Sequence, residues 1–208
     1  MSLLLVRHGE TALNAARVLQ PADTPLSARG IAQADALARR LGTGMAGSRA
    51  AAIVSSDLPR ALRTAQAIAA ATGLSISTTP LLHERNFGDL RGRPYDSLAV
   101  NPLTNREAPP GGESADEFEH RVGLAFAHIV RLRGELAGDL IVVSHGLVIG
   151  QMLARHASLP AGSLAPAHLG NTSLSIVGAV APHLATLLNC TRHLDGVIGD
   201  DERALSGG

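Results

Sequence analysis

The sequence contains no lysine, and all 18 of its basic residues are arginines. A chain without lysine cannot form a Schiff base on an ε-amino group and cannot supply the lysine of a Walker-type phosphate loop. Cysteine is almost as scarce: Cys190 stands alone, which excludes an internal disulfide framework and predicts a reducing compartment. These absences remove two large classes of enzyme site and the small disulfide-stabilised scaffolds.

Net charge and long apolar runs are missing as well. The 18 arginines balance 18 acidic residues, so the formal net charge of zero gives no support for binding nucleic acid or a membrane surface. No apolar run approaches the roughly 18 residues that a membrane span needs. The short apolar stretch after Met1 and Ser2 has no cationic lead and no small-residue cleavage site, which favours a buried strand over a signal peptide. We therefore expect a soluble, cytoplasmic protein with neither nucleic acid nor a membrane as partner.

Short apolar runs alternate with longer periodic segments along the 208 residues. The runs at 3–6, 51–54 and 140–143 predict three buried strands, and two more are expected near 174–177 and 184–188. A helix is expected from about Leu147 to His156. Three other helices are predicted from apolar stripes at helical spacing: Ile31, Ala34, Leu37 and Leu41; Leu58, Leu62, Ala65 and Ala69; and Phe118, Val122, Ala125, Ile129 and Leu136. This alternation predicts an α/β fold with a mostly parallel sheet covered on both faces, a three-layer α/β/α sandwich.

One long segment breaks the alternation. From Glu84 to Gly112 no periodicity survives, and Pro and Gly residues punctuate the stretch, so it is expected to be a lid-like excursion at about 84–112. Residues 114–117 have the spacing of a capping box and should begin the next helix. The polar stretch 196–208 is expected to be a mobile tail. The sequence therefore predicts one domain over residues 1–195.

Reactive side chains follow three of the predicted strands. Arg7 and His8 come directly after the first strand, residues 55–60 after the second, and His145 after the third. Because ligands collect at the carboxyl ends of parallel strands, these groups should meet at one edge of the sheet. Arg60 also lies at a helix start, where free backbone N–H groups favour an anion. Each residue alone is typical of a structural histidine or a surface charge, but their common placement predicts a single site.

The residues around these strand ends match a known family. Leu5-Val6-Arg7-His8-Gly9-Glu10-Thr11, with Asn14, resembles the signature of the histidine phosphatase superfamily, also called phosphoglycerate mutase-like proteins. Further blocks follow in the family's order: Asp23-Thr24-Pro25-Leu26-Ser27, Ser55-Ser56-Asp57-Leu58-Pro59-Arg60, Glu84-Arg85-Asn86-Phe87-Gly88, Gly111-Gly112-Glu113-Ser114 with Arg121, and Val143-Ser144-His145-Gly146. The resemblance covers residues 3 to about 178 and implies a phosphoglycerate mutase-like fold with a mixed central sheet. One departure is Pro21, since the family usually has glycine after Gln20.

The resemblance implies a role for each matching residue. His8 would be the nucleophile that becomes phosphorylated, and Glu84 would be the general acid for the leaving oxygen and then the base that activates water. Four residues would hold the phosphoryl group: Arg7, Asn14, Arg60 and His145. Such donors stabilise charge on the equatorial oxygens during phosphoryl transfer. The two arginines should keep His8 neutral, and a partly apolar pocket beside Phe87 should keep Glu84 protonated. The resemblance implies no cofactor.

Two alternatives come from other classes of protein. The first is a metal enzyme with the ligands His8, Asp57, Glu84 and His145. No close ligand pair such as H-E-x-x-H occurs, and two neighbouring arginines would repel a cation, so we expect no metal. The second is an inactive relative that acts as a regulatory or binding module. Such relatives normally lack a histidine or the acid, whereas this chain retains them.

The nearest alternative is a phosphoglycerate mutase. In the family, cofactor-dependent mutases are longer and carry a larger, lysine-containing insertion after the acid-bearing block. Here only 26 residues (85–110) separate Glu84 from Gly111, and this shorter cover predicts easier entry of water and hydrolysis of a small phosphomonoester. Arg85 and Arg91 are candidate contacts for a carboxylate or second phosphate of the substrate, or else surface charges. Homodimers occur in the family, so a homodimer is expected by analogy only.

Overall fold

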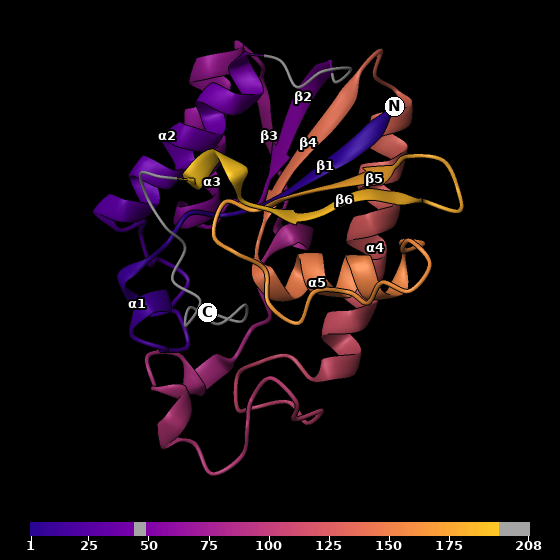
Figure 1. Cartoon of the computed structure of the whole chain (residues 1–208). Helices are drawn as coiled ribbons and strands as arrows, with labels where there is room; N and C mark the ends of the chain where they lie inside the picture. Colours follow the sequence, from indigo (N-terminus) through magenta and orange to yellow (C-terminus); the bar gives the residue numbers. More distant parts are fainter. Residues whose placement is uncertain (44–48, 196–208) are drawn as a thin grey trace.

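The computed structural model describes residues 1–43 and 49–195, and the tail predicted at 196–208 lies outside the described residues (Figure 1). Six strands form one sheet: β1 (Ser2–Arg7), β2 (Ala50–Ser55), β3 (Ile76–Thr78), β4 (Asp139–Ser144), β5 (Leu174–Gly178) and β6 (Ala185–Cys190). The α-helices are α1 (Ala12–Ala15), α2 (Ala28–Gly42), α3 (Pro59–Thr72), α4 (Ala115–Gly134) and α5 (Gly146–Arg155). Four short 3₁₀ helices complete the elements: η1 (Pro80–Leu82), η2 (Gly88–Leu90), η3 (Tyr95–Ser97) and η4 (Arg192–Leu194).

The sheet has the order β3-β2-β4-β1-β5-β6. Strands β1 to β4 are mutually parallel, whereas β5 runs antiparallel to its neighbours β1 and β6. The prediction of a mostly parallel, mixed sheet is therefore confirmed. Strand β3 was not predicted, because its three residues Ile-Ser-Thr include one apolar side chain and none is fully buried.

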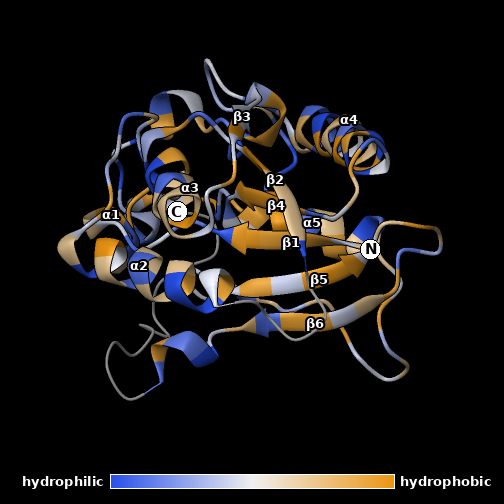
Figure 2. Ribbon diagram, turned by 90° about the horizontal axis from the view of Figure 1, so that it is seen from above, coloured by the Kyte–Doolittle hydropathy of each residue, from blue (hydrophilic) through white to orange (hydrophobic). Residues whose placement is uncertain are grey.

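Alternation of side chains along the central strands builds two apolar layers. Leu4 and Val6 of β1 pack with α2 and α3, while Leu3 and Leu5 pack with α4 and α5. Figure 1 shows the two helix pairs on opposite sides of the sheet. Figure 2 shows the central strands as mostly hydrophobic, as expected for strands buried on both faces. The molecule is thus the three-layer α/β/α sandwich that the sequence predicts.

Most of the predicted helix boundaries hold. Ser27 caps α2, Ser114 and Glu117 form the capping box of α4, and Gly73 ends α3 in the left-handed conformation at φ 72°. Two details of the apolar stripes were wrong. Ile31 of α2 is 38% exposed, since Gly30 and Gln33 take the buried face there. Leu136 lies beyond the end of α4 at Gly134, although it still packs on the core.

The excursion at 84–112 contains two short 3₁₀ helices, and it has a small core of its own. Phe87 and Tyr95 pack with Leu19, which precedes the loop at Pro21. The excursion also closes on itself at Gly88, which has φ 50° and where a Cβ would lie 2.0 Å from the Pro110 carbonyl oxygen. This segment is therefore packed against the carboxyl edge of the sheet, where the predicted site lies. Among the described helices, none is long and apolar enough to cross a membrane.

Candidate active site

The carboxyl ends of β1 and β4 bring two histidines together. His8 follows β1 and His145 follows β4, and these strands are paired in parallel with Arg7 opposite Ser144. The centroids of the two imidazole rings lie 5.0 Å apart, with 61° between their planes. Both rings are fully buried. The neighbouring strand β2 adds Ser55 and Ser56 at the same edge.

The His8 ring is oriented by its own backbone neighbour. Its Nδ1 lies 2.7 Å from the Gly9 carbonyl oxygen, which can only accept, so Nδ1 carries the proton and Nε2 carries the lone pair. Among the described residues, Nε2 has no hydrogen-bond partner. Burial lowers the pKa of His8 well below its usual value of 6.5, and the charges of Arg60 and Arg7 lower it further. The ring is therefore neutral at physiological pH, with one nitrogen lone pair available.

His145 is held from the strand next to its own. Its Nε2 lies 2.9 Å from the Ser56 hydroxyl, while its buried Nδ1 finds no partner within residues 1–43 and 49–195. Burial is again the main reason that its pKa lies well below 6.5, followed by the charge of Arg60. Each histidine thus presents one unused ring nitrogen.

Two buried guanidinium groups flank the histidine pair, and main-chain carbonyl groups hold both. Arg7 Nη1 donates to the Leu169 carbonyl oxygen, and Arg60 Nη1 donates to those of Pro21 and Ala22 at 3.4 and 3.3 Å. Burial lowers the pKa of Arg60 to about 10, which leaves it charged at neutral pH. The loop departure at Pro21 therefore lies at a contact with Arg60, and it still provides the carbonyl that this contact uses.

Asn14 adds a further donor. It is the third residue of α1, and its Oδ1 accepts a hydrogen bond from the Thr11 backbone N–H at 3.1 Å, completing a capping box. Its buried Nδ2 has no acceptor in the described part of the chain. The same applies to Nε of Arg60. Several N–H groups are thus available to an anion at this edge.

Glu84 follows η1 and is 5% exposed. Its two carboxyl oxygens accept hydrogen bonds from the backbone N–H groups of Arg85 at 3.0 Å and Leu147 at 3.1 Å. Burial raises the pKa of Glu84 to about 7, against the opposing effects of these N–H groups, Arg60 and Arg7. Both the protonated and the ionised carboxyl are therefore accessible near neutral pH, as suits a group that gives and takes a proton in turn.

Contacts distant in sequence position the loop that carries His8. The Asn171 amide donates to the His8 carbonyl oxygen at 3.1 Å, and the Thr64 hydroxyl accepts from the Gly9 N–H at 3.1 Å. Gly9 approaches Gly30 so closely that a Cβ on Gly9 would lie 2.4 Å from the Gly30 carbonyl oxygen. Sequence reasoning assigned no role to Asn171, Thr64 or Ser56. Ser56 and Thr64 stand in or beside a matched motif block, whereas Asn171 is 163 residues from His8 and carries no local signal.

The two predicted substrate contacts have different surroundings. The Arg85 guanidinium is buried and donates to the carbonyl oxygens of Pro102 at 3.2 Å, Asn105 at 3.0 Å and Glu113 at 3.3 Å, so it fastens the excursion. Arg91 is half-buried and lines a cavity of about 480 Å³ together with Glu84, Asn86 and His83. Its charge is close enough to lower the pKa of Arg60. Of the two, Arg91 is the one that faces open space beside Glu84.

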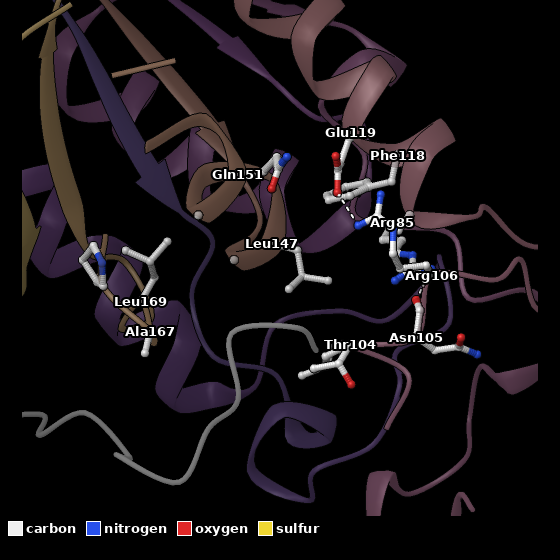
Figure 3. Close-up of a pocket in the computed structure, with 15 residues that line it drawn as sticks. Arg85, Thr104, Asn105, Arg106, Phe118, Glu119, Leu147, Gln151, Ala167 and Leu169 are labelled. Carbon is white, nitrogen blue, oxygen red and sulfur yellow. Dashed lines mark hydrogen bonds and ion pairs between the residues drawn. The ribbon is translucent and has the colours of Figure 1, made fainter. Parts of the chain in front are cut away.

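A second cavity of about 260 Å³ lies between α5, the start of α4 and the excursion. Figure 3 shows Leu169 on one side of it and Arg85 with Arg106 on the other, with Leu147 between them. Leu147 also supplies the N–H that binds Glu84, so this cavity adjoins the site at Glu84. Among the described residues, no group of three or more His, Cys, Asp or Glu side chains is placed to hold a metal ion.

The fold is an α/β sandwich, and neutral histidines and buried arginines gather at the carboxyl edge of its sheet. This arrangement is the one expected of an enzyme that binds an anionic group. The sequence model of the histidine phosphatase superfamily (branch 1) matches residues 3–187. The chain belongs to this superfamily and is an enzyme of it, which confirms the resemblance drawn from its motifs.

Relatives and solved structures carry two kinds of name. A probable phosphoglycerate mutase GpmB of Yersinia pestis is 38% identical over 188 residues, covering 85% of this chain and 84% of the relative. The mycobacterial glucosyl-3-phosphoglycerate phosphatase, solved with VO3, is 30% identical with a TM-score of 0.70 and coverage of 85% and 90%. A putative alpha-ribazole-5'-P phosphatase from Escherichia coli is 28% identical with a TM-score of 0.76 and coverage of 92% and 97%.

Proposed function

We propose that the protein is a phosphatase that hydrolyses a small phosphomonoester through a phosphohistidine on His8. The observation that carries the proposal is the neutral His8 ring: its Nε2 has no hydrogen-bond partner among the described residues, and the charges of Arg60 and Arg7 are close enough to lower its pKa. A phosphoryl group needs this combination, because the nucleophile must keep its lone pair while positive charge stabilises the equatorial oxygens.

The reaction takes two steps. Arg7, Arg60, Asn14 and His145 bind the phosphoryl oxygens, and His8 Nε2 attacks phosphorus while the bond to the leaving oxygen breaks. Protonated Glu84 gives its proton to that oxygen, so the alcohol leaves neutral. In the second step the Glu84 carboxylate takes a proton from water, the water oxygen attacks phosphorus, and the P–N bond breaks. Inorganic phosphate leaves, and His8 and Glu84 return to their starting protonation states.

Hydrolysis is favoured over mutase action by the short cover of the site. The excursion between Glu84 and Gly111 is 26 residues long (85–110) and carries no lysine. A mutase must retain its phosphorylated intermediate while the substrate reorients, which requires a site better closed against water. The solved relatives named above as phosphatases support this choice, whereas the name of the Yersinia relative supports phosphoglycerate mutase as the second candidate.

The two candidates differ in the fate of 3-phosphoglycerate. We expect the purified protein to release inorganic phosphate from 3-phosphoglycerate or from other phosphomonoesters in a metabolite panel, as followed by ³¹P NMR. Conversion between 3- and 2-phosphoglycerate should be slower than phosphate release. Interconversion that outpaces phosphate release would establish the mutase instead. A protein that does neither, and takes up no label from phosphorylated metabolites, would be an inactive relative.

Arg91 is proposed to bind a second anionic group of the substrate. It lines the cavity next to Glu84, and no hydrogen bond or ion pair from its side chain occurs among the described residues. Replacing Arg91 with alanine should raise KM for a substrate with an added carboxylate, such as 3-phosphoglycerate, by about 10-fold, since one hydrogen bond to a charged group contributes about 1.5–3 kcal/mol. For p-nitrophenyl phosphate KM should change less than about 3-fold.

The matched control for this variant is Arg93→Ala, which removes an exposed arginine two residues away that lines neither cavity. Steady-state kinetics of both variants on both substrates measure the effect. Equal changes in KM for the two substrates in Arg91→Ala would show that Arg91 does not recognise the second anion.

A further inference from the structure

Arg121 of α4 binds the main chain around Glu84, and every N–H of its guanidinium group donates a hydrogen bond. Nε and Nη2 bind the two carboxylate oxygens of Glu113 at 2.7 and 2.8 Å. Nη1 donates to the carbonyl oxygens of Leu81 at 2.9 Å and His83 at 2.8 Å, and Nη2 donates to that of Glu84 at 3.4 Å. An arginine has five N–H donors, so none remains for a substrate anion.

Glu113 also forms hydrogen bonds with the backbone of the segment that carries Glu84. Its Oε2 accepts a hydrogen bond from the Asn86 backbone N–H at 2.9 Å, and its own N–H donates to the Asn86 carbonyl oxygen at 2.7 Å. Burial alone would raise the pKa of Glu113, but the hydrogen bonds from Arg121 and Asn86 hold it below its usual value. The carboxylate is therefore charged at neutral pH, and its bidentate pair with Arg121 is complete.

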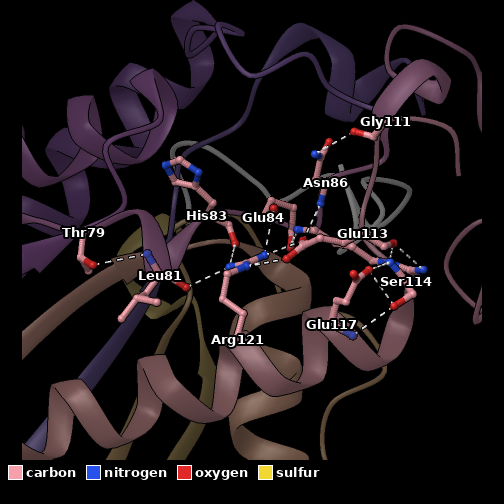
Figure 4. A network of polar contacts seen from close by, with 11 residues as sticks. Thr79, Leu81, His83, Glu84, Asn86, Gly111, Glu113, Ser114, Glu117 and Arg121 are labelled. Atoms are coloured by element: carbon pink, nitrogen blue, oxygen red, sulfur yellow. Dashed lines mark hydrogen bonds and ion pairs between the residues drawn. The ribbon is translucent and has the colours of Figure 1, made fainter. Parts of the chain in front are cut away.

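The contacts together hold the backbone on both sides of Glu84. Figure 4 shows Arg121 at the centre, with hydrogen bonds to Leu81, His83, Glu84 and Glu113. In the described part of the chain the Glu84 carboxyl itself makes two hydrogen bonds, to the N–H groups of Arg85 and Leu147. Because the Arg85 N–H belongs to the peptide group whose carbonyl Arg121 holds, rotation of that peptide would move the carboxyl.

We propose that Arg121, fixed by Glu113, is a positioning residue that sets where the Glu84 carboxyl lies relative to the leaving oxygen. The proposal rests on the proposed role of Glu84 as general acid. Arg121 acts through the backbone at 81–86 and does not touch the phosphoryl group. Its loss should therefore weaken proton transfer to the leaving group and leave binding of the phosphoryl group largely intact.

Leaving groups of different basicity separate these two effects. Arg121→Ala should lower kcat/KM for an alkyl phosphate, whose leaving oxygen needs a proton, by about 100-fold, within the contribution of about 10² to 10⁴ expected from a positioned acid. For p-nitrophenyl phosphate, whose leaving group needs little help, kcat/KM should fall less than about 5-fold, because kcat/KM excludes the later hydrolysis that is common to both substrates. The alkaline limb of the pH profile of kcat/KM should also shift, because the surroundings of the Glu84 carboxyl change.

Two further variants keep the test decisive if Arg121→Ala does not fold. Glu113→Gln removes the charge that orients Arg121 and should give the same selective loss, only smaller. Arg121→Lys keeps the positive charge but presents three donors from one nitrogen, so it should restore stability without restoring the alkyl phosphate rate. The matched control is Arg131→Ala, which removes an exposed ion pair with Glu135 on the same helix and should change neither rate.

An equal loss of kcat/KM on both substrates in folded Arg121→Ala and Glu113→Gln would overturn the proposal, since it would mean a general structural role. Full recovery of the alkyl phosphate rate in Arg121→Lys would overturn it as well. The proposed function fails separately: it fails if the unaltered protein releases no phosphate from either substrate.

Discussion

The His8→Ala variant is expected to lose phosphomonoester turnover and to form no phosphoprotein. In the proposed mechanism Nε2 of His8 attacks phosphorus, whereas Nε2 of His145 is hydrogen-bonded to the Ser56 hydroxyl. Removing the imidazole removes the covalent pathway, whereas Arg7, Arg60 and Asn14 remain to bind the substrate. We expect kcat to fall on the order of 10⁴-fold or more, the scale seen when an enzyme loses its nucleophile.

Rapid quenching after mixing with ³²P-labelled substrate measures the intermediate, which is acid-labile and stable to base when the phosphate is on histidine. The matched control is His120→Ala, since His120 is an exposed histidine of α4 outside the site. The control should keep both the label and the turnover. Near-normal turnover in folded His8→Ala would contradict the mechanism.

The Glu84→Gln variant is expected to show the second large effect. Glutamine keeps the size of the side chain but has no transferable proton, so kcat/KM for alkyl phosphates should fall by about 10²- to 10⁴-fold. The loss of kcat/KM for p-nitrophenyl phosphate should be much smaller, because kcat/KM reports transfer to His8 and not the later hydrolysis, in which Glu84 is the base for every substrate. In the unaltered protein the protonated acid is present below its pKa of about 7 and is lost above it, so alkyl phosphate turnover should decline as pH rises through 7. This alkaline limb should be absent from the variant.

Glu84 should also make stability depend on pH. Its pKa is about 7 in the folded protein, against 4.5 ordinarily, so between these values the unfolded chain gives up a proton that the folded chain retains. The contribution of Glu84 to the free energy of unfolding should therefore fall as pH rises from about 4.5 to 7. The lowered pKa values of His8 and His145 act in the opposite direction, so the effect of Glu84 is the difference between the unaltered protein and Glu84→Gln. Thermal melts of both proteins across this range measure the difference. Parallel melting curves, together with equal rates for the two leaving groups, would exclude a buried, protonated acid at this position.

The fold was largely predictable because its signals are local. The apolar runs that form β1, β2 and β4 and the capping box at Ser114 depend only on neighbouring residues, so the sandwich and the meeting of His8 with His145 followed from sequence. Ile31 was misplaced because periodicity counts apolar residues and cannot see that Gly30 must contact the His8 loop.

The parts of the site that escaped prediction are contacts over long separations. Asn171 reaches the His8 carbonyl from just before β5, and Ser56 reaches His145 from the end of the neighbouring strand β2. Arg85 was predicted either to contact the substrate or to be a surface charge. Its guanidinium instead binds main-chain carbonyl oxygens of the excursion, and no motif encodes these contacts. Local pattern therefore indicates which side chains gather at the edge, while tertiary packing decides which of them remain available.

Within residues 1–43 and 49–195, main-chain carbonyl oxygens hold three buried arginines in place. Arg7, Arg60 and Arg85 are each held in this way. A carbonyl oxygen has no proton to gain or lose, and it is present whatever side chain its residue carries. The positions of these guanidinium groups should therefore depend little on pH. They should also depend little on which residues supply the carbonyl oxygens, as Pro21 illustrates. The proposed anion site should therefore stay assembled in mildly acidic conditions, in which a carboxylate partner would become protonated and would bind an arginine less tightly.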